Sequence, residues 1–235
     1  MIRNLRTLGV AFVAVFAMSA VAASAAHATE ARFTCGKTLE KNCEVTVEAD
    51  PQAPGQVFVT NAGTITCNKF HAVSGSIPDG VKQSSVTLTG LEYSECEFAG
   101  LAAKVTVSEG CHYTLTSGNT EIEPEKATGN VTLAETAGKA CVITIKSLKC
   151  EVTVKATQLF ENAITYENKK TTGIPEEITA NATTGEKIKY TTGGTCIGGA
   201  GNFENGKFNG KVTARAFELN GTTTGTQTDL TLVDA

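Results

Sequence analysis

Eight cysteines are the most reactive side chains in the sequence, and their spacing limits the chemistry that they can perform. Thiol redox catalysis uses two cysteines separated by two residues at the start of a helix, and this spacing occurs nowhere in the chain. Structural zinc needs closely spaced cysteine or histidine ligands, and the chain has only three histidines. The sequence therefore predicts no metal site. The even number of cysteines favours disulfides among Cys35, Cys43, Cys67, Cys96, Cys111, Cys141, Cys150 and Cys196.

Candidate catalytic groups outside the cysteines are few. No GxSxG nucleophile elbow is present, and His71 and His112 lie in strand-like stretches without an evident partner, so a serine hydrolase is not expected. Glycoside hydrolysis would need two positioned carboxylates. The acids are densest in TEIEPEK and IPEEI, at Glu121, Glu123, Glu125, Glu176 and Glu177. Both groups surround prolines, so we interpret them as solvated loop acids. We expect no catalytic residue and no cofactor, and the sequence assigns no binding residue.

The elements that must position any site are short stretches with period-two alternation, such as QVFVT, SSVTLTG, AAKVTVS and CVITIK. Turn residues separate them, including Asn-Gly at 205–206 and at 209–210, which suits tight hairpins. No amphipathic helical window of convincing length occurs after the first 28 residues. The sequence therefore predicts an all-β fold, an antiparallel sandwich or barrel stapled by disulfides.

One expected hairpin turns at the tripeptide SEG. Pairing Val107 with Cys111 across this three-residue loop places Val105 opposite Tyr113 on a wholly apolar face. The opposite face is polar, because it pairs Thr106 with His112. A two-residue loop would mix the two faces, since a one-residue slip turns every side chain over. This register predicts that His112 faces solvent and that Cys111 points toward the core.

A second expected hairpin turns at the tripeptide PDG. Placing Ile77 opposite Ser84 leaves the hydrophobic alternation out of phase beyond Gly90, which predicts a β-bulge at that glycine. The bulge brings Cys96 one step closer to Cys67 on the neighbouring strand. These two cysteines are therefore expected to bond.

Cys141 and Cys150 are close in sequence but are not expected to bond. A tight turn within KSLK pairs Ile145 with Cys150 and leaves Cys141 four residues further along the strand. At about 3.3 Å per residue the two cysteines are then roughly 13 Å apart. A disulfide permits a Cα separation of no more than about 7 Å.

Two further arguments complete the expected pairing. The segment 29–56 is expected to contain an N-terminal hairpin in which Cys35 and Cys43 flank the loop GKTLEKN. Two antiparallel reversals return Cys111 and Cys141 to one end of a sheet. Eight cysteines allow 105 connectivities, and only the first two pairs carry independent arguments. The expected pairs are Cys35–Cys43, Cys67–Cys96, Cys111–Cys141 and, by elimination, Cys150–Cys196.

The first 28 residues have the three parts of a secretory signal. A basic start and an apolar stretch over 8–22 precede Ala26-His27-Ala28, a small-x-small cleavage site. The apolar stretch of about fifteen residues is shorter than the roughly 20 that span a bilayer. We expect a mature chain that is secreted or associated with the cell envelope. The expected domains are a signal peptide, 1–28, and a single β domain, 29–235.

Charge excludes two classes of partner. Removing the two arginines of the expected signal leaves 18 basic and 24 acidic residues, a net charge of −6. Nucleic-acid affinity depends on neutralising phosphates with basic residues, and anionic lipid surfaces attract basic segments. We therefore expect no nucleic-acid partner and no membrane insertion after signal cleavage. The partner would be an unidentified extracellular or cell-surface molecule.

The order of strands and cysteines resembles a known group of proteins. The stretches that carry the similarity are TITCNKFHAVSGSI, SSVTLTGLEYSEC, AAKVTVSEGCHYTL, CEVTVKATQ and GTCIGGAGNFENGKFNGKVT. They resemble uncharacterised secreted, cysteine-containing all-β proteins that soil actinobacteria carry in many copies. The similarity covers roughly residues 57–225 and leaves Cys35 and Cys43 outside. It implies export and a compact β fold, and it implies no activity.

Three functions are consistent with these observations. The leading hypothesis is a non-enzymatic structural or adhesive domain that acts outside the cell. The alternative is a binding protein for a glycan or a small apolar ligand in a barrel mouth or cleft. A hydrolase based on dispersed carboxylates is the third hypothesis. A deep apolar pocket with convergent polar groups would favour the second, and two carboxylates about 5 to 9.5 Å apart in a groove would favour the third.

Overall fold

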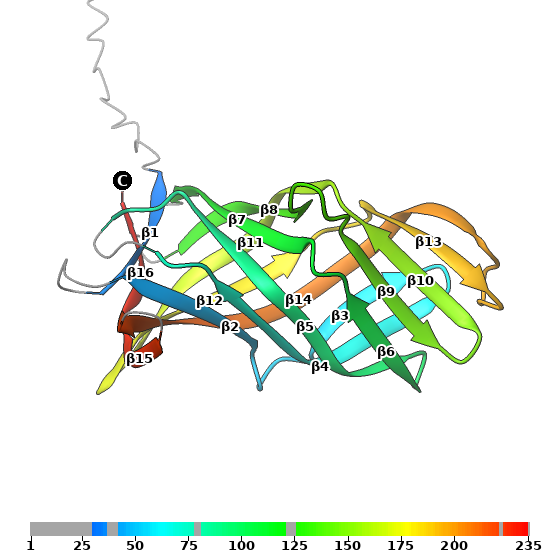
Figure 1. The fold of residues 1–235 in the computed structure, drawn as a ribbon, viewed down its shortest axis with the longest axis horizontal. Helices are drawn as coiled ribbons and strands as arrows, with labels where there is room; N and C mark the ends of the chain where they lie inside the picture. The colour runs from blue at the N-terminus through cyan, green and yellow to red at the C-terminus, as the bar shows by residue number, and fades with distance from the viewer. Residues whose placement is uncertain (1–29, 37–41, 78–80, 121–125, 221–222, 235) are drawn as a thin grey trace, which may run out of the picture.

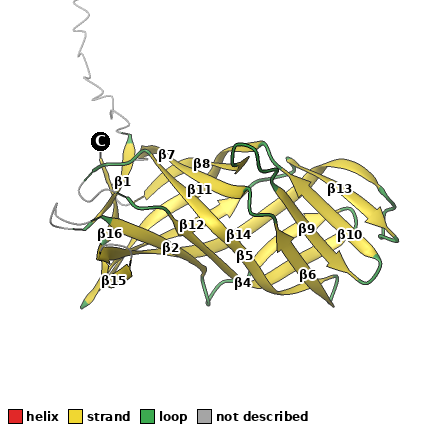
Figure 2. Ribbon diagram, in the orientation of Figure 1, coloured by secondary structure: helices red, strands yellow, loops and turns green. Residues whose placement is uncertain are grey.

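A computed structural model of the chain describes residues 30–36, 42–77, 81–120, 126–220 and 223–234. Within those ranges every regular element is a β-strand and every strand pair is antiparallel (Figure 2). The predicted all-β antiparallel fold is therefore confirmed. No described segment forms a helix with the length and apolar character that a bilayer crossing requires. The expected signal peptide lies outside the described residues.

Eight of the described strands close into a first barrel, which we call the cap barrel. Each strand in the following order pairs with the next, and the last returns to the first. The strands are β2 (Cys43–Ala49), β4 (Gly63–Ser74), β5 (Ser85–Phe98), β7 (Cys111–Thr120), β8 (Lys126–Glu135), β11 (Gln158–Thr171), β12 (Ile174–Thr183) and β14 (Gly201–Asn220). In β2 the alternation is regular, because Val45 and Val47 are buried while Glu48 is exposed.

Eight strands also close into a second barrel, which we call the tip barrel. It shares β4, β5 and β14 with the cap barrel and closes through the β14–β3 pair. Its other strands are β3 (Gln56–Thr60), β6 (Leu101–Val107), β9 (Val142–Ser147), β10 (Cys150–Lys155) and β13 (Ile188–Gly194). The two barrels lie end to end along the long axis of the molecule (Figure 1).

The shared strands join the two barrels because each changes partner along its length. β4 pairs with β3 through residues 63–67 and with β2 through residues 71–73. β5 pairs with β7 near its start and with β6 near its end. The 20-residue strand β14 likewise passes from β13 and β3 to β12 and β2. One continuous wall therefore surrounds the interiors of both barrels.

The first and last described strands form a small separate sheet beside the cap barrel. β1 (Ala31–Cys35) pairs with β16 (Leu230–Asp234), and β15 (Thr223–Thr228) pairs with the end of β14 (Figure 1). The Phe33 ring of β1 makes an edge contact with the Tyr166 ring, at 5.1 Å between centroids. The N-terminal hairpin predicted within 29–56 is wrong, because β1 pairs with the distant β16 and β2 pairs with β14 and β4.

Four disulfides cross-link the described strands. All eight cysteines are bonded, and the four pairs are the ones that the sequence analysis expects. They are Cys35–Cys43, Cys67–Cys96, Cys111–Cys141 and Cys150–Cys196. Disulfides of this density are typical of proteins that fold outside a reducing cytoplasm.

The hairpin predicted at SEG has the right turn and the wrong strand partners. The backbone N–H of Cys111 donates to the carbonyl of Ser108, which makes a turn between β6 and β7. After this turn, however, β6 pairs with β9 in the tip barrel and β7 pairs with β8 in the cap barrel. Val105 and Tyr113 both face the interior, as predicted, although they are not cross-strand partners. His112 is half-buried rather than in solvent.

Two other registers differ from the predicted ones by small steps. Cys67 lies directly opposite Cys96, and a register shift on β5 coincides with Gly90, so the predicted bulge is confirmed. Ile77, however, bridges to Cys43 rather than to Ser84. The β9–β10 turn is also tighter than predicted, because Cys150 lies opposite Ser147 instead of Ile145.

Candidate ligand cavity

The interior of the molecule contains a cavity of about 140 Å³. Side chains of both barrels line it, with Val131 and Leu133 of β8 on the cap side and Val105 and Ile143 of β6 and β9 on the tip side. The lining is overwhelmingly apolar, and four of its residues bring polar side chains. These are Gln56, Tyr93, Tyr113 and Thr184.

The bulge on β5 is the local feature that turns Tyr93 toward this cavity. Val86 and Leu88 are buried before the bulge, and Leu91 is buried after it, so the inward positions change from even to odd numbers. Gly90 accommodates the change with a φ of 60°, a conformation that costs glycine little. Without the extra residue, Tyr93 would point to solvent, because successive side chains of a strand face opposite sides.

Tyr113 reaches the cavity from β7, the neighbouring strand in the cap barrel. It lies directly opposite Leu88 of β5 and alternates with Leu115, which also lines the cavity. The Cys111–Cys141 disulfide ties the start of β7 to the tip barrel. The position of the Tyr113 ring is therefore fixed by strand pairing on both sides and by a cross-link two residues away.

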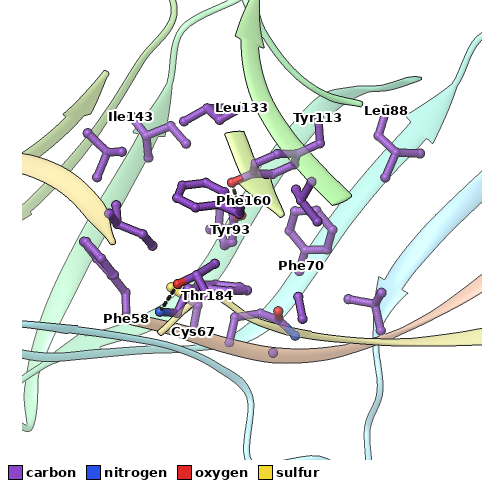
Figure 3. A pocket seen from close by; sticks show the side chains of 18 of the residues that line it. Phe58, Cys67, Phe70, Leu88, Tyr93, Tyr113, Leu133, Ile143, Phe160 and Thr184 are labelled. Carbon is purple, nitrogen blue, oxygen red and sulfur yellow. Dashed lines mark hydrogen bonds between the residues drawn. The ribbon is translucent and has the colours of Figure 1, made fainter. Parts of the chain in front are cut away.

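The hydroxyl groups of Tyr93 and Tyr113 meet inside the cavity, with 3.0 Å between the two oxygens. In Figure 3 the pair lies between Phe160 and Phe70. The Phe70 ring packs against Tyr93 at 4.8 Å between centroids. Both tyrosines form part of the cavity lining. The two phenol groups thus form a polar point in an otherwise apolar cavity.

The same enclosure raises the pKa of both phenols. Burial, followed by the adjacent Tyr113 hydroxyl, raises the pKa of Tyr93 well above its ordinary value of about 10. Burial also raises the pKa of Tyr113, and the hydrogen bond from Tyr93 offsets only part of that change. Both groups therefore carry a hydroxyl hydrogen at any physiological pH.

The other two polar lining residues have protein partners. The Thr184 hydroxyl accepts the backbone N–H of Phe208 at 2.9 Å and donates to the carbonyl of Gly185 at 3.3 Å. The Gln56 side-chain nitrogen donates to the carbonyl of Lys211 at 3.0 Å, which fixes the orientation of this amide. The tyrosine pair differs from both, because among the described residues its two hydroxyl groups bond only to each other.

The carboxylates considered for hydrolysis do not surround this cavity. Glu176 and Glu177 lie within β12 rather than in a loop, which corrects the sequence interpretation for both residues. Glu177 is buried, and its carboxylate accepts from the Nε of Arg215 at 2.5 Å. Arg215 also pairs with Glu48 at 2.9 Å. Glu177 is therefore part of an ion-pair network. Glu121, Glu123 and Glu125 lie outside the described residues.

The two histidines among the described residues are not part of the cavity lining. His71 of β4 and His112 of β7 are half-buried, and neither lines the cavity. Across the described parts of the chain, no three side chains of histidine, cysteine, aspartate or glutamate are grouped closely enough to hold a metal ion.

Sequence reasoning missed the tyrosine pair, although one signal for it was present. Tyr113 was placed on an apolar face opposite Val105, and a tyrosine on such a face needs a hydrogen-bond partner for its hydroxyl. Tyr93 follows the predicted bulge at Gly90, but the partner strand that brings it to Tyr113 was not predicted. Comparison with known proteins adds no further assignment. No family model, no curated protein and no solved structure matches this chain.

Proposed function

We propose that this protein binds a small apolar molecule in the cavity between its two barrels and does so outside the cytoplasm. The observation that carries the proposal is the apolar cavity of about 140 Å³ with a polar point inside it. Engineered protein cavities of about 150 Å³ with a similar apolar lining stay dry and bind benzene or xenon. The expected secretory signal and the four disulfides support an extracellular location.

The cost of leaving the cavity empty supports the same proposal. A closed empty void in a core destabilises a fold by about 24 cal/mol for each Å³, or roughly 3 kcal/mol at a volume of about 140 Å³. Close packing is the norm in protein interiors. A ligand that fills the space would recover much of this free energy. A purely structural or adhesive domain gains nothing from such a void, so the cavity favours the binding hypothesis over the structural one.

The disulfides are placed where they can keep the cavity open. Cys67 is itself part of the lining, and its bond to Cys96 joins the shared strands β4 and β5. The Cys111–Cys141 bond joins the two barrels across a sequence separation of 30 residues. In the chain-entropy account, closing such a loop stabilises the fold by about 3–4 kcal/mol. A stabilisation of this size offsets the free energy that an unfilled core costs the fold.

A thermal-shift titration with benzene tests the proposal. Benzene should raise the melting temperature of the disulfide-intact protein in a concentration-dependent and saturable way, because it binds the folded state alone. Val105→Phe should abolish the shift, because Val105 lines the cavity and a phenyl group would occupy the space.

Thr106→Phe is the matched control, because Thr106 is the next residue of β6 and faces solvent. This variant should respond to benzene like the unmodified protein. The proposal is wrong if benzene causes no saturable shift in the unmodified protein, or if the shift is the same in all three proteins.

A further inference from the structure

The hydroxyl groups of the four tyrosines differ in how fully they are used. Tyr166 donates to the carbonyl of Thr116 at 3.3 Å. Tyr190 donates to the side-chain oxygen of Asn205 at 3.2 Å and accepts the backbone N–H of Asn61 at 2.7 Å. Tyr93 and Tyr113 contact each other, and this is the hydrogen bond that the structure gives them.

A pair of phenols cannot satisfy itself. Two hydroxyl groups bring two hydrogens, and a single contact between the oxygens uses one of them. The second hydrogen has no acceptor among the described residues. Leaving a buried donor without an acceptor costs more than leaving an acceptor with a spare lone pair. One hydroxyl hydrogen is therefore available to whatever occupies the cavity.

We infer that the ligand is a small, mostly hydrocarbon molecule with one hydrogen-bond acceptor, such as a ketone oxygen, which receives the spare hydroxyl hydrogen of the Tyr93–Tyr113 pair. This inference rests on the proposed function, since it describes the occupant of the same cavity. The apolar walls contact the hydrocarbon body, as Phe70, Phe160 and Leu133 are positioned to do (Figure 3). The oxygen fixes the orientation of the molecule.

The pair has a built-in redundancy that shapes the experiment. If one tyrosine is replaced by phenylalanine, the other keeps its hydroxyl hydrogen and can donate directly to the ligand. The single variants Tyr93→Phe and Tyr113→Phe should therefore still bind a ketone well. Only the double variant Tyr93→Phe/Tyr113→Phe lacks both hydroxyl donors. It should fold, because replacing both partners of a buried hydrogen bond by apolar groups of similar shape is close to neutral.

The test compares cyclohexanone with methylenecyclohexane, two molecules of nearly the same shape that differ in the presence of an acceptor oxygen. Dissociation constants of both are measured by calorimetric titration for the unmodified protein and for Tyr93→Phe/Tyr113→Phe. The double variant should bind cyclohexanone about tenfold more weakly and should keep its affinity for methylenecyclohexane. A tenfold change corresponds to roughly 1.4 kcal/mol, the size of one neutral hydrogen bond.

Tyr190→Phe is the control, because its hydroxyl is bonded to protein atoms and does not face the cavity. It should leave the ratio of the two dissociation constants unchanged. If the unmodified protein binds neither molecule, the proposed function fails. If the unmodified protein and the double variant both bind methylenecyclohexane and give the same ratio of the two dissociation constants, the cavity binds ligands without a hydrogen bond to an acceptor. This inference alone is then overturned.

Discussion

The tip end and the middle of the interior both contain tyrosine and phenylalanine rings, but the surroundings of these rings differ. At the tip end, the Tyr190 ring packs against Phe203 at 5.3 Å between centroids and against Phe58, which also lines the cavity, at 5.8 Å. In the middle, Tyr93 and Tyr113 face about 140 Å³ of unfilled space. The interior thus contains large aromatic side chains in both regions. The cavity is a local property of the middle, not a shortage of large side chains.

The cap end repeats the arrangement of the tip end. Phe33 packs on Tyr166, which is almost completely buried and whose hydroxyl donates to a backbone carbonyl. At both ends, therefore, a tyrosine ring packs against an aromatic partner and its hydroxyl group bonds to another protein group. The regions differ in what the tyrosine hydroxyl groups contact: at the two ends they bond to other protein groups, and in the middle Tyr93 and Tyr113 bond to each other beside the cavity.

The largest expected effect comes from truncating one tyrosine of each region. Tyr190→Ala should reduce the free energy of unfolding by about 3–5 kcal/mol, because it removes a packed ring between two aromatic partners. Tyr113→Ala should cost about 2 kcal/mol, because one side of that ring already faces the cavity. The larger hole would also admit water to the Tyr93 hydroxyl. Denaturant unfolding with the disulfides intact measures both values, and equal losses would contradict the comparison.

A smaller effect is expected from adding volume in each region. Val152 on β10 has no exposed surface, so Val152→Phe should destabilise the protein by about 1–3 kcal/mol through overpacking. Val105→Phe should be neutral or should stabilise by up to about 1 kcal/mol, because the added ring enters existing space. The same unfolding assay applies. A loss for Val105→Phe as large as that for Val152→Phe would show that the middle is packed after all.

The smallest effect is on the pH dependence of stability. Burial raises the pKa of Tyr93, Tyr113 and Tyr166, whereas tyrosines in the unfolded chain ionise near 10. The folded state therefore retains protons that the unfolded state releases, so stability is unaffected below about pH 10 and decreases as the pH rises above it. Tyr93→Phe/Tyr113→Phe should lose less stability over this alkaline range than the unmodified protein. Equal losses in the two proteins would show that these phenols ionise freely in the folded state.

Sequence patterns predicted the parts of this molecule that depend on neighbouring residues. Period-two alternation identified the strands, and the phase change at Gly90 located the bulge that turns Tyr93 inward. The Cys35–Cys43 pair also followed from the short loop between the two cysteines, and the Cys67–Cys96 pair from the register across the PDG turn. These features are local, or depend on strands that are joined by a short turn.

Features that depend on closure of the barrels could not be predicted in this way. The strands on either side of the SEG turn separate into different barrels, so a hairpin register between them was wrong from Val107 onward. The pairing of β1 with β16 joins the first and last described strands, and no turn signal specifies it. The cavity is the volume left after both barrels close, and alternation in a sequence shows which side chains face inward but not how much space remains between them.

The central claim is that the middle of the interior is a site for a small apolar molecule, and a crystal of the protein pressurised with xenon tests it most directly. Xenon binds apolar cavities without needing a polar contact, so its position does not depend on the role of the tyrosine hydroxyls. We expect a xenon atom among Tyr113, Phe160 and Leu133, and we expect Val105→Phe to remove it. A crystal in which xenon occupies only surface sites, or in which these side chains fill the space themselves, would contradict the account.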